Sequence, residues 1–166
     1  DIHIPVVIDA DGLNSFGTKI ASLKALSSEV VLTPHPGEAS RLLNSDISSI
    51  QADRIGAAQR LVEITGATVV LKGACTLTAC PDGQVYLNPT GNPGLATAGT
   101  GDILSGMIGA FLAQGYKASE ASAAAVYIHG LAADEAKKKT GEIGMIATDL
   151  LEHIPGLINS FAGTRN

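Results

Sequence analysis

Three short apolar runs, each ending in a polar residue, constrain the fold of this chain most. They occupy residues 4–9, 29–33 and 68–72, and helical stretches separate them. Short runs rich in Val, Ile and Leu, without polar alternation, are typical of strands buried on both faces, as in parallel sheets covered by helices. The pattern therefore predicts an α/β fold whose central sheet is mostly parallel.

The remaining elements follow from turn and helix signals. An Asp82-Gly83 pair between residues 76–79 and 84–87 predicts a hairpin, which adds antiparallel strands to the sheet. Helices are predicted around residues 19–26 and over residues 37–43, 48–64, 102–114, 118–139 and 147–161, with Gly115 capping the helix at 102–114. Because no internal repeat or linker interrupts the chain, we expect residues 1–166 to form a single domain.

Charge and hydropathy exclude several classes of partner. The chain has 11 Lys and Arg against 16 Asp and Glu, whereas nucleic acids and anionic membranes are bound largely through clusters of Lys and Arg. A small phosphorylated ligand is still allowed, because backbone N–H groups and Mg²⁺ can hold it. No signal peptide is visible, and no apolar run approaches the ~20 residues that span a bilayer. We therefore expect a cytoplasmic protein without nucleic-acid or membrane partners, whose Cys75 and Cys80 are free thiols.

The segment that carries chemistry is the glycine-rich stretch at residues 88–106. Gly99, Thr100, Gly101 and Asp102 stand where the predicted helix 102–114 begins. Glycines let backbone N–H groups approach a ligand closely, and the positive end of the helix dipole favours an anion, so this turn predicts a phosphate site. Its spacing fits neither a P-loop, nor a Rossmann fingerprint, nor a nucleophile elbow. Asp102 beside that site is either a helix N-cap or a catalytic carboxylate.

Four further segments carry a family resemblance. They are residues 6–13 (VVIDADGL), 32–38 (LTPHPGE), 70–74 (VLKGA) and 90–96 (TGNPGLA), the last of which leads into the Asp102 turn. Together with that turn they resemble the NAD(P)H-hydrate dehydratases of the ribokinase-like superfamily, over essentially the whole chain. The resemblance implies a three-layer fold with helices on both faces of the sheet. Since members of the family have a substantial portion before the first of these segments, we expect the chain to lack the N-terminal part.

The resemblance also implies a role for each candidate residue. Asp102 would be the base toward the substrate hydroxyl. The nucleotide would be bound by the turn before Asp102 and by the segment that ends the third strand, that is, by Gly99, Thr100, Gly101, Lys72, Gly73, Ala74, Cys75 and Thr76. The hydrated dinucleotide would be contacted by His35 and Asn92 together with Asp102.

Several candidates also have a simpler structural explanation. His35 lies between two prolines, where packing alone can fix a histidine, and a lysine at a strand edge such as Lys72 is commonly exposed. Asp9 and Asp11 end the first strand, where carboxylates either order the water ligands of Mg²⁺ or pair with turn N–H groups. His129, on an Ala-rich helix, is expected to be a packed histidine and not a ligand.

The implied activity is nucleotide-dependent dehydration of hydrated NADH or NADPH. ATP or ADP, with Mg²⁺, would phosphorylate the hydrate hydroxyl, and elimination of phosphate would restore the dihydronicotinamide. Two alternatives stay open: a small-molecule kinase of the same superfamily, which would release a stable phosphate ester, and an inactive nucleotide-binding module. A homo-oligomer and a hydrate epimerase, fused or separate, are further partners compatible with the resemblance.

Overall fold

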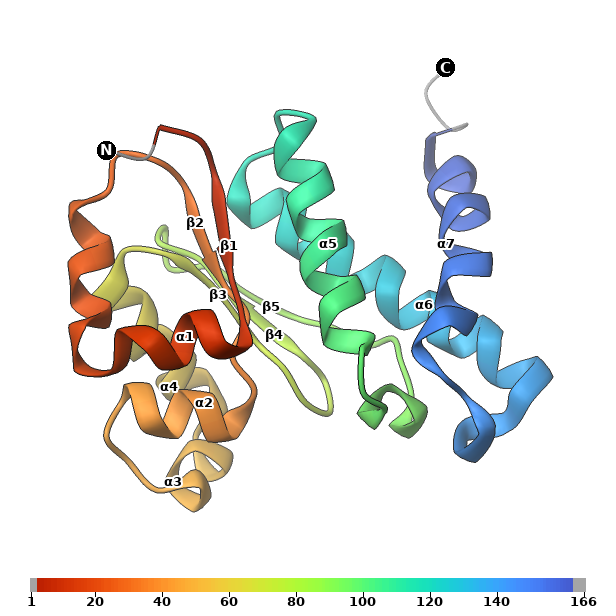
Figure 1. The fold of residues 1–166 in the computed structure, drawn as a ribbon, viewed down its shortest axis with the longest axis horizontal. Coiled ribbons are helices and arrows are strands. Elements are labelled where there is room, and N and C mark those ends of the chain that lie inside the picture. Colours follow the sequence, from red (N-terminus) through yellow and green to blue (C-terminus); the bar gives the residue numbers. More distant parts are fainter. Residues whose placement is uncertain (1–2, 163–166) are drawn as a thin grey trace.

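A five-stranded sheet forms the centre of the fold (Figure 1). The computed structural model describes residues 3–162 of the chain. The strands lie across the sheet in chain order: β1 (Val6–Ile8), β2 (Val30–Leu32), β3 (Thr68–Leu71), β4 (Leu77–Ala79) and β5 (Val85–Leu87). The pairs β1–β2 and β2–β3 are parallel, whereas β3–β4 and β4–β5 are antiparallel. The predicted strands and the hairpin are therefore confirmed, and the sheet is mixed.

Alternate strand residues pack against opposite layers of helices, because successive side chains of a strand point to opposite faces. Leu32 and Val69 belong to one apolar cluster, and Val31 and Val70 belong to a second. All four side chains are fully buried. The sheet is thus covered on both faces, which confirms the predicted three-layer α/β architecture.

The first helix layer contains the helices that connect the strands of the parallel part: α1 (Ala10–Phe16), the 3-10 helix η1 (Gly17–Ala25), α2 (Pro36–Leu42), α3 (Ile47–Ala52) and α4 (Arg54–Thr65). The prediction of one helix over residues 48–64 is wrong, because α3 and α4 meet at Asp53. Asp53 leaves the helical conformation (φ −138°, ψ 74°), and its carboxylate accepts a hydrogen bond from Gly56 N (2.8 Å). An aspartate that competes in this way for backbone N–H groups favours a helix start over a helix interior.

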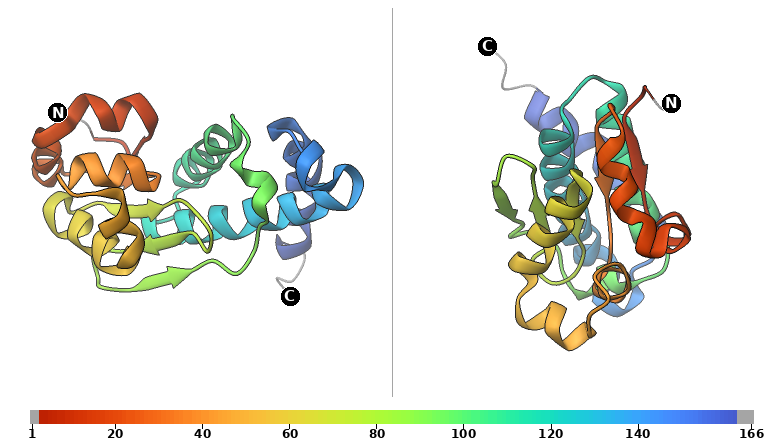
Figure 2. Two further views of the ribbon diagram at one scale, coloured as in Figure 1. Left: turned by 90° about the horizontal axis from the view of Figure 1, so that it is seen from below. Right: turned by 90° about the vertical axis from the view of Figure 1, so that its left-hand side faces the viewer.

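The second layer is built from the C-terminal helices. The 3-10 helix η2 (Pro93–Ala96) precedes α5 (Thr100–Ala113), α6 (Ala118–Gly144) and α7 (Ala147–Ala162). The helices α5 and α6 cover the sheet, while α7 packs on α6 through a separate apolar cluster (Figure 2). Gln114 is the C-cap of α5, and Gly115 takes the left-handed conformation directly after it (φ 89°). The helix therefore ends at Ala113, one residue earlier than predicted, and its cap is Gln114 and not Gly115.

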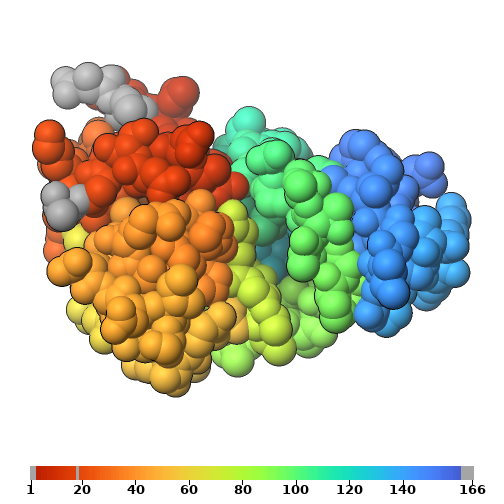
Figure 3. All heavy atoms as spheres, turned by 60° about the horizontal axis from the view of Figure 1, so that its bottom comes forward, coloured from red at the N-terminus to blue at the C-terminus, as the bar shows by residue number. Residues whose placement is uncertain are grey.

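The N-terminal and C-terminal helices lie far apart. In the space-filling view, the N-terminal helices (red to orange) and the C-terminal helices (blue) lie at opposite ends of the molecule, with α5 and the loop before it (green) between them (Figure 3). The residues around the predicted Asp102 turn thus occupy the middle of the molecule.

Two further sequence expectations concern membranes and thiols. Among residues 3–162, none of the helices combines the length and the apolar character that crossing a membrane requires. Cys75 and Cys80 are both free, as predicted. Cys80 is buried, and this burial, with a smaller contribution from the charge of Asp82, raises the pKa of its thiol to about 11.

Candidate active site

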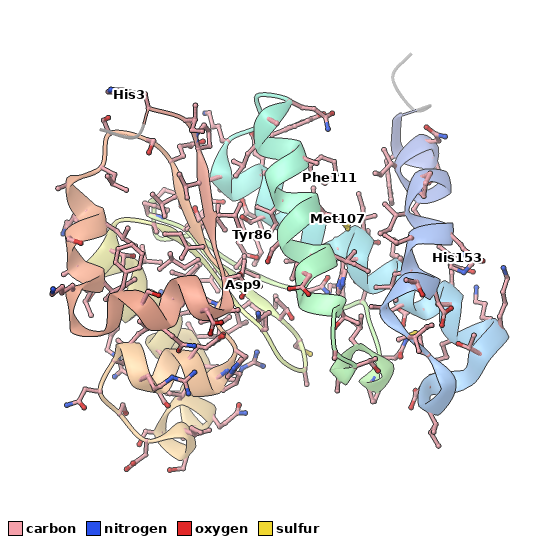
Figure 4. The ribbon with its side chains drawn as sticks, in the orientation of Figure 1. His3, Asp9, Tyr86, Met107, Phe111 and His153 are labelled. Carbon is pink, nitrogen blue, oxygen red and sulfur yellow. The ribbon has the colours of Figure 1, made fainter. Side chains whose placement is uncertain are left out.

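The carboxyl ends of the three parallel strands meet the start of α5. Asp9 follows β1, Thr33 follows β2 and Lys72 follows β3, because parallel strands end at one edge of the sheet. Asp9 lies beside the first turns of α5, whereas His3 and His153 lie away from this edge (Figure 4). In open α/β folds, this edge is where ligands bind.

A network of polar side chains centred on Asp9 joins these elements. One carboxylate oxygen of Asp9 accepts hydrogen bonds from Lys72 Nζ (2.7 Å) and Ala10 N (2.9 Å), and the other accepts from Ser105 Oγ (2.8 Å). Ser105 Oγ in turn lies 3.4 Å from Thr33 Oγ1. Burial acts to raise the pKa of Asp9, but the bonds from Lys72 and Ser105 outweigh it and lower this pKa below its ordinary value of 3.8. Asp9 and Lys72 therefore form a partly buried ion pair that ties β1 to β3.

The predicted anion site lies at the N-terminal end of α5, which no side chain caps. Gly99 is the N-cap (φ 89°), and no side chain caps the helix. The backbone N–H groups of Gly101 and Asp102 therefore stay available to a ligand. A Cβ atom at Gly101 would lie 3.5 Å from Lys72 Nζ, so the ammonium group stands directly beside this turn. The structure thus brings together Lys72, Gly99 and Gly101, which the sequence placed at one nucleotide site.

Asp102 is the third residue of α5, and its side chain is exposed. Because Gly99 occupies the N-cap position, the N-cap alternative for Asp102 is wrong. A negative charge in the first turn still interacts favourably with the helix dipole. The carboxylate is therefore exposed beside the open N–H groups, where a bound substrate can reach it.

Thr100 and His129 hold the turn before Asp102 in place through buried hydrogen bonds. The buried Thr100 hydroxyl donates to the carbonyl oxygens of Leu95 (2.7 Å) and Thr97 (2.9 Å), so this hydroxyl is used within the protein. The Thr100 carbonyl accepts a hydrogen bond from His129 Nε2 (2.9 Å). Burial lowers the pKa of His129 to about 4, against a smaller opposing effect of this bond, so His129 is neutral near pH 7. His129 is the packed histidine that the sequence predicted.

The loop after β3 presents the other predicted nucleotide residues. Gly73 (φ 137°) and Cys75 (φ 51°) both have positive φ, and Thr76 Oγ1 donates back to the Gly73 carbonyl (3.1 Å). Arg54 of α4 supports this loop, since its guanidinium donates to the carbonyl oxygens of Leu71 (3.2 Å) and Ala74. The Thr76 hydroxyl is thus used within the loop, and Ala74 and Cys75 contribute backbone at its tip.

His35 is held by α2. Its Nδ1 accepts hydrogen bonds from Gly37 N (3.0 Å) and Glu38 N (3.3 Å), while the Glu38 carboxylate accepts from His35 N (2.7 Å). This capping box explains the position of the histidine without a ligand. Half of the His35 side chain stays exposed at the strand edge, and its Nε2 lies 3.5 Å from Glu38 Oε1.

Asn92 and Asp11 have local roles in the structure. Asn92 is the N-cap of η2, with Oδ1 accepting from Gly94 N (3.0 Å) and Nδ2 donating to Asp134 (3.0 Å). The exposed Asp11 accepts a long hydrogen bond from Asn14 Nδ2 (3.5 Å). Within residues 3–162, no group of three or more His, Cys, Asp or Glu side chains is arranged to hold a metal ion.

Sequence reasoning missed four residues of this region: Thr33, Arg54, Ser105 and Asp134. A signal for Ser105 did exist, because it lies one helical turn after Asp102 and so shares its face of the helix. Arg54 and Asp134 contact their loops across 20 and 43 residues of chain respectively, so no local pattern marks them.

Two surface hollows lie away from the strand edge. One, of about 150 Å³, is lined by β5 and α6 residues including Tyr86 and Tyr127, and the other, of about 200 Å³, lies between Leu23 and Gly66. Neither includes a predicted site residue. The chemistry-bearing side chains and the open helix start identify the strand edge, and not either hollow, as the candidate active site.

Comparison with known proteins identifies the family of this chain. A family model described as NAD(P)H-hydrate dehydratase matches residues 1–156. The chain belongs to the NAD(P)H-hydrate dehydratase family. It is 46% identical over 159 residues to the bifunctional NAD(P)H-hydrate repair enzyme Nnr of Moorella thermoacetica, covering 96% of this chain and 30% of that protein. It is 48% identical over 149 residues to the ADP-dependent (S)-NAD(P)H-hydrate dehydratase of Neisseria meningitidis, covering 88% of this chain and 50% of that one.

Solved structures agree with this family membership. The ADP/ATP-dependent NAD(P)H-hydrate dehydratase of Bacillus subtilis, co-crystallised with ATP and Mg²⁺, superposes with a TM-score of 0.82 at 34% identity, over 95% of this chain and 55% of that chain. A ribokinase from Thermotoga maritima, at 12% identity and a TM-score of 0.51, shares the fold alone. The ribokinase-like fold is therefore confirmed, and the chain spans about half or less of the length of these family members.

Proposed function

We propose that this chain carries the nucleotide site and the catalytic carboxylate of an enzyme that dehydrates hydrated NADH and NADPH at the expense of ATP or ADP. One observation supports this most: Asp102 is exposed in the first turn of α5, beside uncapped backbone N–H groups and the Lys72 ammonium. Anion-binding groups and a carboxylate thus lie within one helical turn. Membership of the dehydratase family supports the choice of substrate.

The nucleotide phosphates would bind at the start of α5. The N–H groups of Gly101 and Asp102 and the helix dipole offer an anion site, and Lys72 adds a positive charge. Gly73, Ala74, Cys75 and Thr76 would border the rest of the nucleotide, while His35 would face the hydrated dinucleotide. Phosphoryl transfer depends mainly on positioning and electrostatic stabilisation of this kind.

Asp102 would start the reaction as a general base. It takes the proton of the hydrate hydroxyl while the hydroxyl oxygen attacks the terminal phosphoryl group of the nucleotide. The bond from that phosphorus to the bridging oxygen breaks, and AMP or ADP leaves. The lone pair of the ring nitrogen then expels the phosphate, and loss of the neighbouring ring proton restores the dihydronicotinamide. The sum of these steps is dehydration of the hydrate and hydrolysis of one phosphoanhydride bond.

The carboxylates near the start of α5 suit a Mg²⁺ ion that binds together with the nucleotide better than a Mg²⁺ ion held by the protein alone. Mg²⁺ is commonly held by one or two carboxylates together with substrate phosphates, and Asp9, Asp11 and Asp102 are the nearby carboxylates on these elements. Asp9 already accepts bonds from three donors, so it would act through water molecules. Bound there, Mg²⁺ would neutralise charge that develops on the transferred phosphoryl group.

The partners and location follow the same proposal. Hydrated NADH or NADPH is the substrate, and the bifunctional relative from Moorella makes a hydrate epimerase on the same or a separate chain the expected companion activity. We expect the enzyme to act in the cytoplasm, where these dinucleotides are used. A homo-oligomer is compatible with the proposal and independent of it.

The test is incubation of the full-length protein with hydrated NADH, Mg²⁺ and either ATP or ADP. Recovery of NADH absorbance, with one phosphate released per NADH, supports the dehydratase. A stable phosphorylated product without NADH would instead identify a small-molecule kinase. Neither product, with nucleotide still bound, would identify an inactive nucleotide-binding module. Parallel reactions with ATP and ADP establish which nucleotide is used faster.

A further inference from the structure

The loop that connects β5 to η2 rests on one face of α6. Thr90 Oγ1 donates to the Tyr127 carbonyl (2.9 Å), and a Cβ atom at Gly130 would lie only 2.1 Å from Thr90 Oγ1. Asp134 follows one turn later on the same face. Since residues 127, 130 and 134 are spaced as neighbours on a helix, the loop lies directly against the α6 backbone.

The Asp134 carboxylate holds this loop with both of its oxygens. One accepts from Gly91 N (2.9 Å) and the other from Asn92 Nδ2 (3.0 Å). The remaining end of the Asn92 amide, Oδ1, accepts from Gly94 N at the start of η2 (3.0 Å). Because an amide has a donor end and an acceptor end, these partners allow only one orientation of Asn92.

This loop is connected to the turn that carries Asp102. Gly94 is buried, and a Cβ atom there would lie 2.6 Å from the Met145 side chain, so η2 packs closely against the Met145 side chain. The Thr100 hydroxyl then donates to the carbonyl oxygens of Leu95 and Thr97, at the end of η2. A continuous series of hydrogen bonds and backbone thus runs from Asn92 through η2 to the first turn of α5.

We propose that Asp134 and Asn92 form a positioning pair, which sets η2 and, through Thr100, the placement of the Asp102 turn. The inference rests on the proposed function. It differs from the sequence prediction in one respect: Asn92 acts through the loop, and not through a contact with the hydrated dinucleotide. Neither side chain is then a catalytic residue.

The pair can be exchanged, which gives a sharp test. Asp134→Asn leaves one acceptor oxygen for two donors, Gly91 N and Asn92 Nδ2, so one of these two hydrogen bonds is lost whichever way the new amide turns. Asn92→Asp places two carboxylates against each other, so each single variant disrupts the network. In the double variant Asp134→Asn/Asn92→Asp, the new amide accepts from Gly91 N and donates to the new carboxylate, which accepts from Gly94 N. All three hydrogen bonds are restored, and the net charge is unchanged. Glu135→Gln, which removes an exposed charge from the same helix, is the matched control.

The four proteins and wild type are compared in the full-length enzyme by kcat and KM for the hydrate, by ADP affinity in calorimetry and by melting temperature. We expect each single variant to lower kcat by about 10- to 100-fold, the scale of a misplaced catalytic group, with the double variant within a few-fold of wild type. Glu135→Gln should match wild type. Additive losses in the double variant would overturn the pair, and restored kcat with a persistently high KM would show that Asn92 contacts the substrate.

These readouts also separate the inference from the proposed function. If wild type recovers no NADH, the proposed function fails, and ADP affinity and melting temperature still test the pair. Recovery of both values in the double variant, after a fall in each single variant, would retain the pair without the dehydratase. Values that fall further in the double variant would overturn the pair in either case.

Discussion

Gly101 faces the Lys72 ammonium with no side chain between them, since a Cβ atom there would lie 3.5 Å from Nζ and 3.9 Å from an Asp9 oxygen. Because the φ of Gly101 is not positive, a larger residue is tolerated by the backbone. We expect Gly101→Val to weaken ADP binding about tenfold or more, because its methyl groups occupy the space beside the open N–H groups. Titration calorimetry measures this. Gly109→Val, at an open position of the same helix, is the control, and equal affinities for the two variants would move the phosphate site elsewhere.

Asp9 makes a second prediction, for stability as a function of pH. Its pKa in the folded protein lies below 3.8, so the unfolded chain takes up the proton first as pH falls. The stabilisation is thus fully present above pH 3.8 and is lost as pH falls through the lowered pKa. We expect Asp9→Asn to reduce the free energy of unfolding near pH 7 by on the order of 1–3 kcal/mol, since Lys72 loses its charged partner.

Urea unfolding at a series of pH values tests this prediction. The difference between wild type and Asp9→Asn should shrink on the acid side of pH 3.8. A difference that stays constant over the whole acid range would mean that the carboxylate is not held in its charged form by Lys72 and Ser105.

For single residues, the sequence identifies candidate site residues better than it identifies their contacts. The glycine turn, Asp102 and Lys72 were identifiable because each belongs to a compact motif. The contacts of Asp9 were not, because Lys72 and Ser105 lie 63 and 96 residues away along the chain. The N-cap alternative for Asp102 failed because Gly99 already starts the helix, which only the backbone conformation reveals.

Helix α6 supports the start of α5 through one buried hydrogen bond, from His129 to the Thr100 carbonyl. Burial lowers the pKa of His129 from its ordinary 6.5 to about 4, so the unfolded chain binds a proton between these values and the folded protein does not. This stabilisation is full above pH 6.5 and decreases as pH falls toward 4. The free energy of unfolding should therefore fall by up to roughly 1.4 kcal/mol per pH unit in this interval, owing to this one residue.

The variant His129→Gln isolates this contribution. Glutamine keeps an N–H donor for Thr100 but has no proton to gain, so the pH dependence between 6.5 and 4 should be smaller than in wild type. Denaturant unfolding across this interval measures both slopes. Equal slopes would show that His129 is protonated in the folded protein as readily as in the unfolded chain.

Among the elements, the strands were predictable and some helix limits were not. Short apolar runs identify buried strands directly, whereas the division between α3 and α4 depends on the Asp53 side chain, whose competition with the helical backbone has no effect on apolar periodicity. Residues 19–26 illustrate a second limit. Their apolar spacing predicts a helix, but η1 is a 3-10 helix that ends at Ala25.

In the whole molecule, these elements meet at the candidate active site, at the carboxyl edge of the parallel strands. The parallel strands supply Asp9 and Lys72, α2 supplies His35, and the second helix layer supplies the Asp102 turn. The sequence predicts the parallel strands from their apolar runs and the antiparallel hairpin from the Asp82-Gly83 turn, and the family resemblance implies the two helix layers. It does not predict that α6 holds both the Thr100 turn and the loop at Asn92, because those contacts arise only when the layers pack.

The most direct measurement is the turnover of the full-length Asp102→Asn enzyme with hydrated NADH and ADP or ATP. The exposed Asp102 side chain caps nothing, so the substitution should cost at most the ~0.3–1 kcal/mol of a first-turn charge and leave nucleotide binding intact. If Asp102 is the base, NADH recovery falls by about 100-fold or more with unchanged nucleotide affinity. Recovery within a few-fold of wild type, in a folded variant that still binds nucleotide, would contradict the assignment of Asp102 as the catalytic base.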